Sequence, residues 1–286
     1  MGDQATTLRV IQGAKSGEPP VVPSIPRRAI AVSGGKGGVG KSTIAANLAI
    51  AFAQLGSRAL LVDTDLGMAD LNLLLGVAPE KSILDVLGGA PITDALVAAH
   101  GISLLPALNG SYLLSTIGPA AQARVLELVT SLRASFDTLV IDIAAGIGQA
   151  QTTFAGAATD TIVVVNPEPL SMADAYACLK TLAVQQGVRH AFVLPNRVMS
   201  RVQADEVVAR LRALVSRFLD LELTALPFVP SDLSVAEAAQ CGTPLLVHAP
   251  GSPAARAIRH LPRSLAALAP ETGEWLRPAR AQGRLR

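Results

Sequence analysis

Short runs of apolar, mostly branched residues alternate along the chain with longer segments in which apolar residues recur at helical spacing. The apolar runs, which we predict as strands, span residues 28–33, 57–63, 102–105, 136–142, 161–165 and 190–194. The helical segments span residues 43–55, 82–87, 91–99, 119–135, 203–218 and 252–268. Continuous apolar strands that alternate with helices are typical of parallel sheets buried on both faces. The pattern therefore predicts an α/β fold: a doubly wound, mostly parallel sheet with helices on both faces.

Residues with strong positional preferences mark the ends of several helices. Gly56 follows the first helix, at a position where many helices end in a left-handed conformation. Ser171, with Asp174 three residues later, has the spacing of a capping box and predicts the start of a further helix. Pro262 lies inside the last helical segment, so we expect it to kink or split that helix.

The distribution of glycine and proline divides the chain into three parts. Residues 1–27 form a short head and a linker rich in glycine and proline, which we do not expect to fold by itself. Residues 28–270 contain all the predicted strands and helices and form one domain. Residues 271–286 form a basic tail that carries four arginines, no lysine and the only tryptophan.

Composition limits the class of protein. Half of the 286 residues are apolar, which suffices for a sizeable core, and a net charge of +2 is too small to indicate nucleic-acid binding. Cys178 and Cys241 match no metal-binding spacing, so a reducing cytoplasm fits best. The first residues lack the pattern of a signal peptide. Residues 95–123 carry no charged side chain, but glycine and proline interrupt them, so we predict no membrane span.

The candidate chemistry centres on residues 32–43, Val-Ser-Gly-Gly-Lys-Gly-Gly-Val-Gly-Lys-Ser-Thr, between the first strand and the first helix. They contain the phosphate-loop pattern. Backbone N–H groups of such a loop attract phosphate, Lys41 reaches the β- and γ-phosphates, and Ser42 ligates Mg²⁺. We expect a nucleoside triphosphate to contact Gly34, Gly35, Lys36, Gly37, Gly38, Val39, Gly40, Lys41, Ser42 and Thr43.

A second lysine, Lys36, directly follows the first glycine of the pattern. A lysine in a loop is usually solvated, but this one can point away from its own pocket and neutralise phosphate charge in a second subunit. The string Gly-Lys-Gly-Gly-Val-Gly-Lys-Ser-Thr resembles the deviant Walker A loop of the MinD/ParA class of dimerising ATPases. The resemblance implies ATP and ADP as the nucleotides, a homodimer that forms with ATP, and catalytic roles for Lys36 and Lys41.

Carboxylates follow two predicted strands, at the edge where an open α/β sheet binds its ligands. Asp63 and Asp65 follow the second strand, and Asp142 ends residues 136–142 in the pattern of a Walker B strand that holds the Mg²⁺ shell. The resemblance implies that Asp65 belongs to switch I, where it orients the attacking water and senses Mg²⁺, while Asp63 supports the metal shell. A helix cap is the alternative for Asp65 and for Asp70.

The resemblance also implies further nucleotide contacts. The glutamate that matches Glu168 reaches the nucleotide across the dimer, and the asparagine that matches Asn196, followed here by Arg197, hydrogen-bonds the adenine edge. The chain has no Asn-Lys-x-Asp guanine motif, which favours ATP over GTP. Residues 227–232 correspond to a loop that closes over base and ribose, although turn chemistry also explains its prolines. From this loop we predict nucleotide contacts for Val229, Pro230, Ser231 and Asp232.

The head of the chain carries the segment Asp-Gln-Ala-Thr-Thr-Leu-Arg at residues 3–9. It is similar to a segment of the flagellar-number regulators FlhG/FleN, a branch of the MinD-like ATPases. In that branch the segment docks on the SRP-type GTPase FlhF and stimulates its hydrolysis. An ordinary terminal tail is the alternative. The resemblance implies a partner-binding role for Asp3, Gln4, Ala5, Leu8 and Arg9.

Together these features predict an ATP-dependent dimerising switch that hydrolyses ATP slowly and regulates flagellar number or placement. The implied partners are a second copy, the SRP-type GTPase and a flagellar transcription regulator or switch component, and we expect no specific nucleic acid. The implied location is the cytoplasm, with transient visits to the inner membrane or cell pole. Pro278 and Gly283 interrupt the tail, so any lipid binding is weak. The alternatives are a ParA-type partition ATPase that binds DNA non-specifically, a membrane-cycling MinD-type ATPase and a scaffold without hydrolysis.

Overall fold

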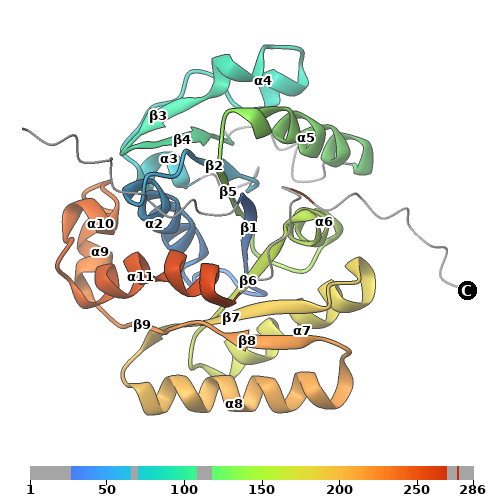
Figure 1. The fold of residues 1–286 in the computed structure, drawn as a ribbon, viewed down its shortest axis with the longest axis vertical. Helices are drawn as coiled ribbons and strands as arrows, with labels where there is room; N and C mark the ends of the chain where they lie inside the picture. The colour runs from blue at the N-terminus through green and yellow to red at the C-terminus, as the bar shows by residue number, and fades with distance from the viewer. Residues whose placement is uncertain (1–26, 66–69, 108–117, 269–275, 277–286) are drawn as a thin grey trace, which may run out of the picture.

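A nine-stranded, mostly parallel sheet forms the centre of the computed structural model, which describes residues 27–65, 70–107, 118–268 and 276 (Figure 1). Eight strands lie in the order β3-β4-β2-β5-β1-β6-β7-β8, and β9 pairs with β7. Within the described chain, every pair of strands is parallel except β3 with β4. The strands are β1 (Arg28–Ser33), β2 (Ala59–Asp63), β3 (Val97–Ala99), β4 (Ile102–Leu105), β5 (Thr138–Asp142), β6 (Asp160–Val165), β7 (His190–Val198), β8 (Glu222–Ala225) and β9 (Val229–Pro230).

Helices cover both faces of the sheet. One hydrophobic cluster packs α5 to α8 against one face, and a second packs α2 and α9 to α11 against the other (Figure 1). The predicted doubly wound α/β architecture is therefore confirmed. The helices are α2 (Lys41–Gln54), α3 (Leu71–Leu74), α4 (Ile83–Leu87), α5 (Pro119–Ser131), α6 (Gln149–Ala157), α7 (Pro169–Gln186), α8 (Arg201–Phe218), α9 (Leu233–Gln240), α10 (Leu245–His248) and α11 (Pro253–Leu268), with 3₁₀ helices η1 (Ile92–Ala95) and η2 (Leu132–Ala134).

The central strand β1 lies between β5 and β6, and all three are buried along their length because helices cover both faces. Ligands of open α/β sheets bind beyond the carboxyl ends of the strands, where the strand order reverses. The register places Val32 beside Asp142, and Asp142 beside Asp63, at that edge. The loop that follows β1 and the two carboxylates therefore meet at one end of the sheet.

The segment over residues 91–99, predicted as a short helix, is only partly helical. Ile92–Ala95 forms η1, but Val97–Ala99 forms strand β3, which pairs antiparallel with β4. His100 and Gly101 have φ of 49° and 84°, which suits a tight turn between two antiparallel strands. Pairing with the edge of the sheet thus overrides the local helical spacing, and the prediction was wrong for this half.

The predicted capping box at Ser171 and Asp174 is wrong. Helix α7 already begins at Pro169, with Glu168 at the N-cap position and no side-chain cap. Proline suits the first turn of a helix because its φ is preset and its missing N–H loses no hydrogen bond there. The Ser171 hydroxyl is buried and instead accepts a hydrogen bond from the backbone N–H of Asn166, at 3.0 Å.

Two other helix predictions need correction. Helix α8 begins at Arg201 rather than at residue 203, because the Ser200 hydroxyl caps it by accepting the N–H of Gln203. Helix α11 is one continuous helix with Pro262 inside it, so of the two expected effects the split does not occur, and the kink stays a prediction. None of the described helices has both the length and the hydropathy needed to cross a bilayer.

Phe192 offers a test of the assigned core, because its ring is completely buried on β7 in the middle of the molecule. We expect Phe192→Ala to lower the free energy of unfolding by about 3–5 kcal/mol, because it removes apolar contacts and leaves a cavity. Phe218→Ala is the control: this ring at the end of α8 is 59% exposed, and its loss should cost less than about 1 kcal/mol. Urea unfolding measures both, and equal losses would contradict the core described here.

Candidate functional site

The phosphate loop, residues 34–40, joins β1 to α2 and has glycine where a side chain would not fit. Gly40 has φ of 97°, which glycine adopts readily and other residues do not. A Cβ at Gly40 would lie 2.5 Å from Nδ2 of Asn196, and one at Gly35 would collide with the backbone carbonyl of Asp174 in α7. The loop backbone is therefore held by close contact with the Asn196 side chain of β7 and with the backbone of α7.

Lys41 begins helix α2 directly after the loop, so the positive N-terminal end of the helix lies at the site. The side chain is buried, and its Nζ donates to the carbonyl of Lys36 at 3.3 Å, which directs it back over the loop. Burial lowers the pKa of Lys41, while the nearby carboxylates of Asp142 and Asp65 act to raise it. A cation and a helix N-terminus thus lie together, as an anion site requires.

Two buried carboxylates lie at the ends of neighbouring strands beside Lys41. Asp63 and Asp142 are direct neighbours in the register of β2 and β5. Burial raises the pKa of Asp142 to about 7, although the Ser42 hydroxyl and the charge of Lys41 act to lower it. Burial and the charge of Asp142 raise the pKa of Asp63 well above its usual value. Both shifts reflect carboxylates that lack sufficient positive charge nearby.

Ser42 and Asp142 fit a divalent cation that binds together with phosphate. Oδ1 of Asp142 is buried without a hydrogen-bond partner among the described residues, and the Ser42 hydroxyl hydrogen-bonds the carboxylate. In the described part of the chain, no cluster of three or more His, Cys, Asp or Glu side chains could hold a metal ion alone. Mg²⁺ commonly binds through one or two protein groups, phosphate oxygens and water. The two residues therefore supply part of a coordination shell and not a complete cage.

Asp65, the predicted switch I residue, lies just beyond β2. Its backbone N–H donates to Oδ1 of Asp63 at 2.9 Å, which fixes the chain as it leaves the strand. Thr64, which sequence reasoning missed, donates its hydroxyl to the backbone carbonyl of Asp142 at 2.6 Å. These bonds tie the start of this segment to the end of β5. Asp70 lies at the N-cap position of α3, but its side chain makes no capping hydrogen bond.

Lys36, in the phosphate loop, pairs with Glu168 at the N-cap of α7. Lys36 Nζ lies 3.4 Å from Glu168 Oε2, and the two side chains are 36% and 61% exposed. We predicted from the sequence that Lys36 and Glu168 face a second subunit, and the structure brings them together on one exposed surface. An ion pair this exposed contributes little stability, so either side chain can exchange its partner.

Strand β7 extends to Val198, four residues beyond its predicted end, and so includes the candidate base-contacting residues. Asn196 is buried, and its Nδ2 donates to the carbonyl of Val39 at 2.8 Å. Arg197 is exposed and has φ of 56°. The backbone N–H of Ser231 donates to the carbonyl of Val198 at 2.9 Å. The candidate base residue thus contacts the phosphate loop directly.

The predicted base loop packs as strand β9 (Val229–Pro230) against β7, with Val229 opposite Asn196. The carboxylate of Asp232 accepts backbone N–H groups of Ser234 and Ala254, each at 3.0 Å. It thereby caps α9 and holds the start of α11. The structure gives Asp232 a structural role, and its contact with nucleotide stays a prediction.

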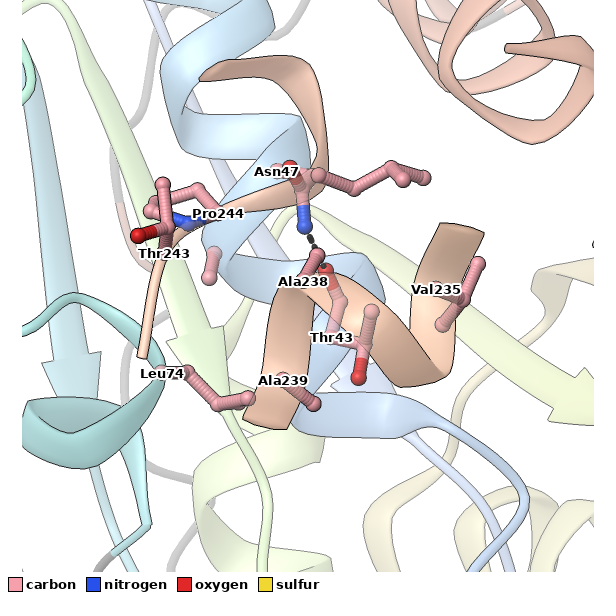
Figure 2. Close-up of a pocket in the computed structure, with 10 residues that line it drawn as sticks. Thr43, Asn47, Leu74, Val235, Ala238, Ala239, Thr243 and Pro244 are labelled. Atoms are coloured by element: carbon pink, nitrogen blue, oxygen red, sulfur yellow. Dashed lines mark hydrogen bonds between the residues drawn. The ribbon is translucent and has the colours of Figure 1, made fainter. Parts of the chain in front are cut away.

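A small cavity lies beside the first two turns of α2 (Figure 2). Its volume of about 10 Å³ leaves room for one water at most. Asn47 borders it and links α2 to α10: its Nδ2 donates to the carbonyl of Thr43 one turn earlier in α2, and its Oδ1 accepts the N–H of Leu246, both at 2.8 Å. The cavity is a packing gap with no room for an organic ligand.

Two predicted regions fall largely outside the described residues. The partner segment and linker, residues 1–26, lie outside them completely. Of the tail over residues 271–286, only Leu276 is described: it forms an isolated antiparallel bridge with Ala158 and packs against the core. Leu276 therefore lies beside the end of α6.

A phosphate loop between a buried strand and a helix, with carboxylates on an adjoining strand, defines a P-loop nucleotide-binding protein. The ParA family model, described as NUBPL iron-transfer P-loop NTPase, matches residues 26–266. The antiactivator FleN of Pseudomonas aeruginosa is 36% identical over 262 residues, which cover 91% of each chain. The chain therefore belongs to the ParA/MinD family of P-loop NTPases, whose members are ATPases.

Two further relatives agree with this assignment. The flagellum site-determining protein YlxH of Helicobacter pylori is 35% identical over 153 residues, which cover 53% of this chain and 52% of that protein. Among solved structures, the septum site-determining protein MinD from Pyrococcus horikoshii, complexed with Mg-ADP, matches with a TM-score of 0.68 at 26% identity. The match covers 83% of this chain and 95% of the MinD chain. The family and the fold predicted from the sequence are both confirmed.

The raised pKa of Asp142 predicts a stability that falls with rising pH in the absence of ligands. In the unfolded chain this carboxyl ionises near pH 4, whereas in the fold it ionises near pH 7. The native state therefore loses up to about 4 kcal/mol, relative to the unfolded state, as pH rises through this window. Asp142→Asn removes the buried charge, so its stability relative to wild type should increase from pH 5 to pH 8.

Urea unfolding at several pH values, without nucleotide or Mg²⁺, measures this. Asp137→Asn is the control, because its hydrogen bond with Arg58 lowers the pKa of Asp137 to about 2. The stability that this ionised carboxylate contributes is present above pH 4 and is lost only as pH falls toward 2. Its stability difference should thus stay constant from pH 5 to pH 8. A constant difference for Asp142→Asn as well would contradict the buried charge.

Proposed function

We propose that this chain is a switch that dimerises with ATP and hydrolyses it slowly, with residues 28–270 as the ATPase domain. The observation that carries the proposal is the different burial of two lysines, one in the phosphate loop and one directly after it. Lys41 is buried, whereas 36% of the Lys36 side chain is exposed, and Lys36 pairs with Glu168. One cation can serve the nucleotide of its own subunit, and the other is available to a neighbouring subunit.

Within one subunit, the phosphate loop surrounds the phosphates with backbone N–H groups, and Lys41 neutralises the β- and γ-phosphates. Ser42 and Asp142 hold Mg²⁺, which shields phosphate charge when bound. The close packing of Gly35 and Gly40 keeps the loop rigid, so that its N–H groups stay in position to bind phosphate. Asp65, at the end of β2, orients the attacking water. Loss of the γ-phosphate then shifts the segments after β2 and β5 between two states.

The dimer would form on the surface that carries Lys36 and Glu168. Leu170 follows in the first turn of α7 and is 60% exposed, and Ile147, in the loop after β5, is 46% exposed. Gly37 comes close to this loop, since a Cβ there would lie 3.9 Å from Cβ of Ala145. A second subunit could bury this apolar area and accept Lys36 on its phosphates. Glu168 would be released from Lys36 and reach the nucleotide across the interface.

Lys36→Ala should leave ATP binding by the single subunit nearly unchanged but remove the dimers that ATP induces, because Lys36 is partly exposed and pairs with the exposed Glu168. Lys41→Ala is the matched control and should lose ATP binding itself, since it removes the buried cation. Light scattering with ATP, together with titration of nucleotide affinity, separates the two effects. Dimers of Lys36→Ala with wild-type affinity would exclude the role in a second subunit. A wild type without ATP turnover would indicate a binding scaffold instead.

The biological role we propose is control of flagellar number or placement. The relatives that support it are the antiactivator FleN, matched over 91% of each chain, and the flagellum site-determining protein YlxH. The partners would be a flagellar transcription regulator or switch component and an SRP-type flagellar GTPase. The segment over residues 3–9, with its Asp-Gln-Ala-x-x-Leu-Arg pattern, would contact that GTPase. We place the protein in the cytoplasm, with transient visits to the inner membrane or cell pole.

The proposed partner segment can be tested directly by GTP hydrolysis. The full chain should stimulate an SRP-type flagellar GTPase severalfold, and a chain that lacks residues 1–12 should not, because the truncation removes the docking residues. The truncated chain should bind ATP as the full chain does, since the phosphate loop begins at Gly34. Equal stimulation by both chains would show that the segment has no such function.

The matching family model is described by iron transfer, so an iron–sulfur cluster carrier is an alternative function. A carrier of an iron–sulfur cluster needs several cysteine ligands close together. The chain has two cysteines, of which Cys178 is buried near Ser33, at 3.5 Å between Sγ and Oγ, while Cys241 is exposed at the end of α9. Two cysteines in such different places do not form a cluster site within one chain, so we favour the switch.

A further inference from the structure

Asn166 lies at the carboxyl end of β6, next to the phosphate loop, and no role is assigned to it above. The residue is buried, with 4% of its surface exposed. Its side-chain amide lies between two backbone carbonyl oxygens, 3.2 Å from that of Asn196 and 3.3 Å from that of Val39. Because both neighbours are acceptors, the amide nitrogen must face them and donate. Asn166 thus links β6 to the end of β7 and to the phosphate loop.

The carbonyl of Val39 receives two amide donors, from Asn166 and from Asn196. A carbonyl oxygen has two lone pairs, so both hydrogen bonds can form together. This carbonyl belongs to the same planar peptide unit as the N–H of Gly40, and in a trans peptide the two groups point in opposite directions. Holding the carbonyl toward the asparagines therefore directs the Gly40 N–H away from them. The orientation of one phosphate-loop N–H depends on two side chains far away in sequence.

The same contacts fix which atom Asn196 can offer to a base. Its Nδ2 gives one of its two N–H groups to the Val39 carbonyl, which fixes the orientation of the side chain and leaves Oδ1 as an acceptor for another partner. A carbonyl oxygen accepts from the 6-amino group of adenine and repels the 6-oxo group of guanine. Asn166 supports this orientation, because it donates to the backbone carbonyl of Asn196 and so holds the strand at that residue. Ser171 holds Asn166 in turn, by accepting its backbone N–H.

We propose that Asn166 is a positioning residue that sets the ATP-over-GTP preference, by fixing the Val39 carbonyl and the strand end that carries Asn196. The proposal rests on the proposed function, since it requires a nucleoside triphosphate on the phosphate loop. It predicts that base selection and phosphate binding are coupled through one peptide group. A residue that never touches the base would therefore change which base is accepted.

Asn166→Ala tests this through the ratio of ATP to GTP affinity, which a general loss of stability would not alter. We expect ATP to bind about tenfold more weakly, as loss of a buried hydrogen bond predicts, and GTP to weaken by a smaller factor, so that the preference for ATP over GTP shrinks. Asn166→Asp keeps the shape but turns an acceptor toward two carbonyls, so it should lower ATP affinity further. Asn196→Ala should reduce the preference too, and the double variant should lose less than the sum.

Asn47→Ala is the matched control, because Asn47 in α2 is also a buried amide with two hydrogen bonds, neither of which involves Val39. It should lower the melting temperature but keep the ATP-to-GTP ratio. An unchanged ratio in both Asn166 variants, with the fold intact by circular dichroism, would overturn the inference. A wild type that binds neither nucleotide would overturn the proposed function itself, and with it this inference.

Discussion

The backbone of the phosphate loop can take its shape only where neighbouring elements approach it without an intervening side chain. Gly35 packs against the backbone of α7, and Gly40 packs against the amide of Asn196. Parallel strands make this possible, because β6 and β7 end at the same edge as β1 and bring Asn166 and Asn196 to the loop. The site thus depends on strand order more than on any single side chain.

Charge is the second constraint, because the pocket carries more negative charge than its own residues neutralise. Burial alone would make Asp63 and Asp142 hard to ionise, and the charged form of Lys41, the buried cation beside them, is itself disfavoured by burial. A bound cation would relieve the carboxylates, and phosphate would relieve the lysine. Ligand binding would then stabilise the fold as well as form the site, by simple mass action.

The surface that carries Lys36 and Glu168 differs from the pocket because its charges are exposed to water. Lys36 and Glu168 remain half exposed, form a weak ion pair and lie close to apolar side chains that nothing in the described chain covers. A pair in water can be exchanged at little cost, whereas the buried groups a few ångströms away cannot. The same short segment therefore combines a fixed inner face with an adaptable outer face, as the proposed dimerisation would require.

The sequence by itself determined the six strands β1, β2, β4, β5, β6 and β7, the phosphate loop, and the carboxylates at the ends of β2 and β5, whereas β8 and β9 were not predicted. Burial on both faces and the backbone conformation of glycine are visible in the local pattern of residues. Only the tertiary structure decided that residues 97–99 form a strand, that α7 starts at Pro169, and that Ser171 serves Asn166. The hydrogen bonds from Asn166 and Asn196 to the Val39 carbonyl were also not predicted, although a polar residue at the end of a buried strand can indicate such a contact. These features depend on which strand ends lie side by side, and long-range pairing has no local signature.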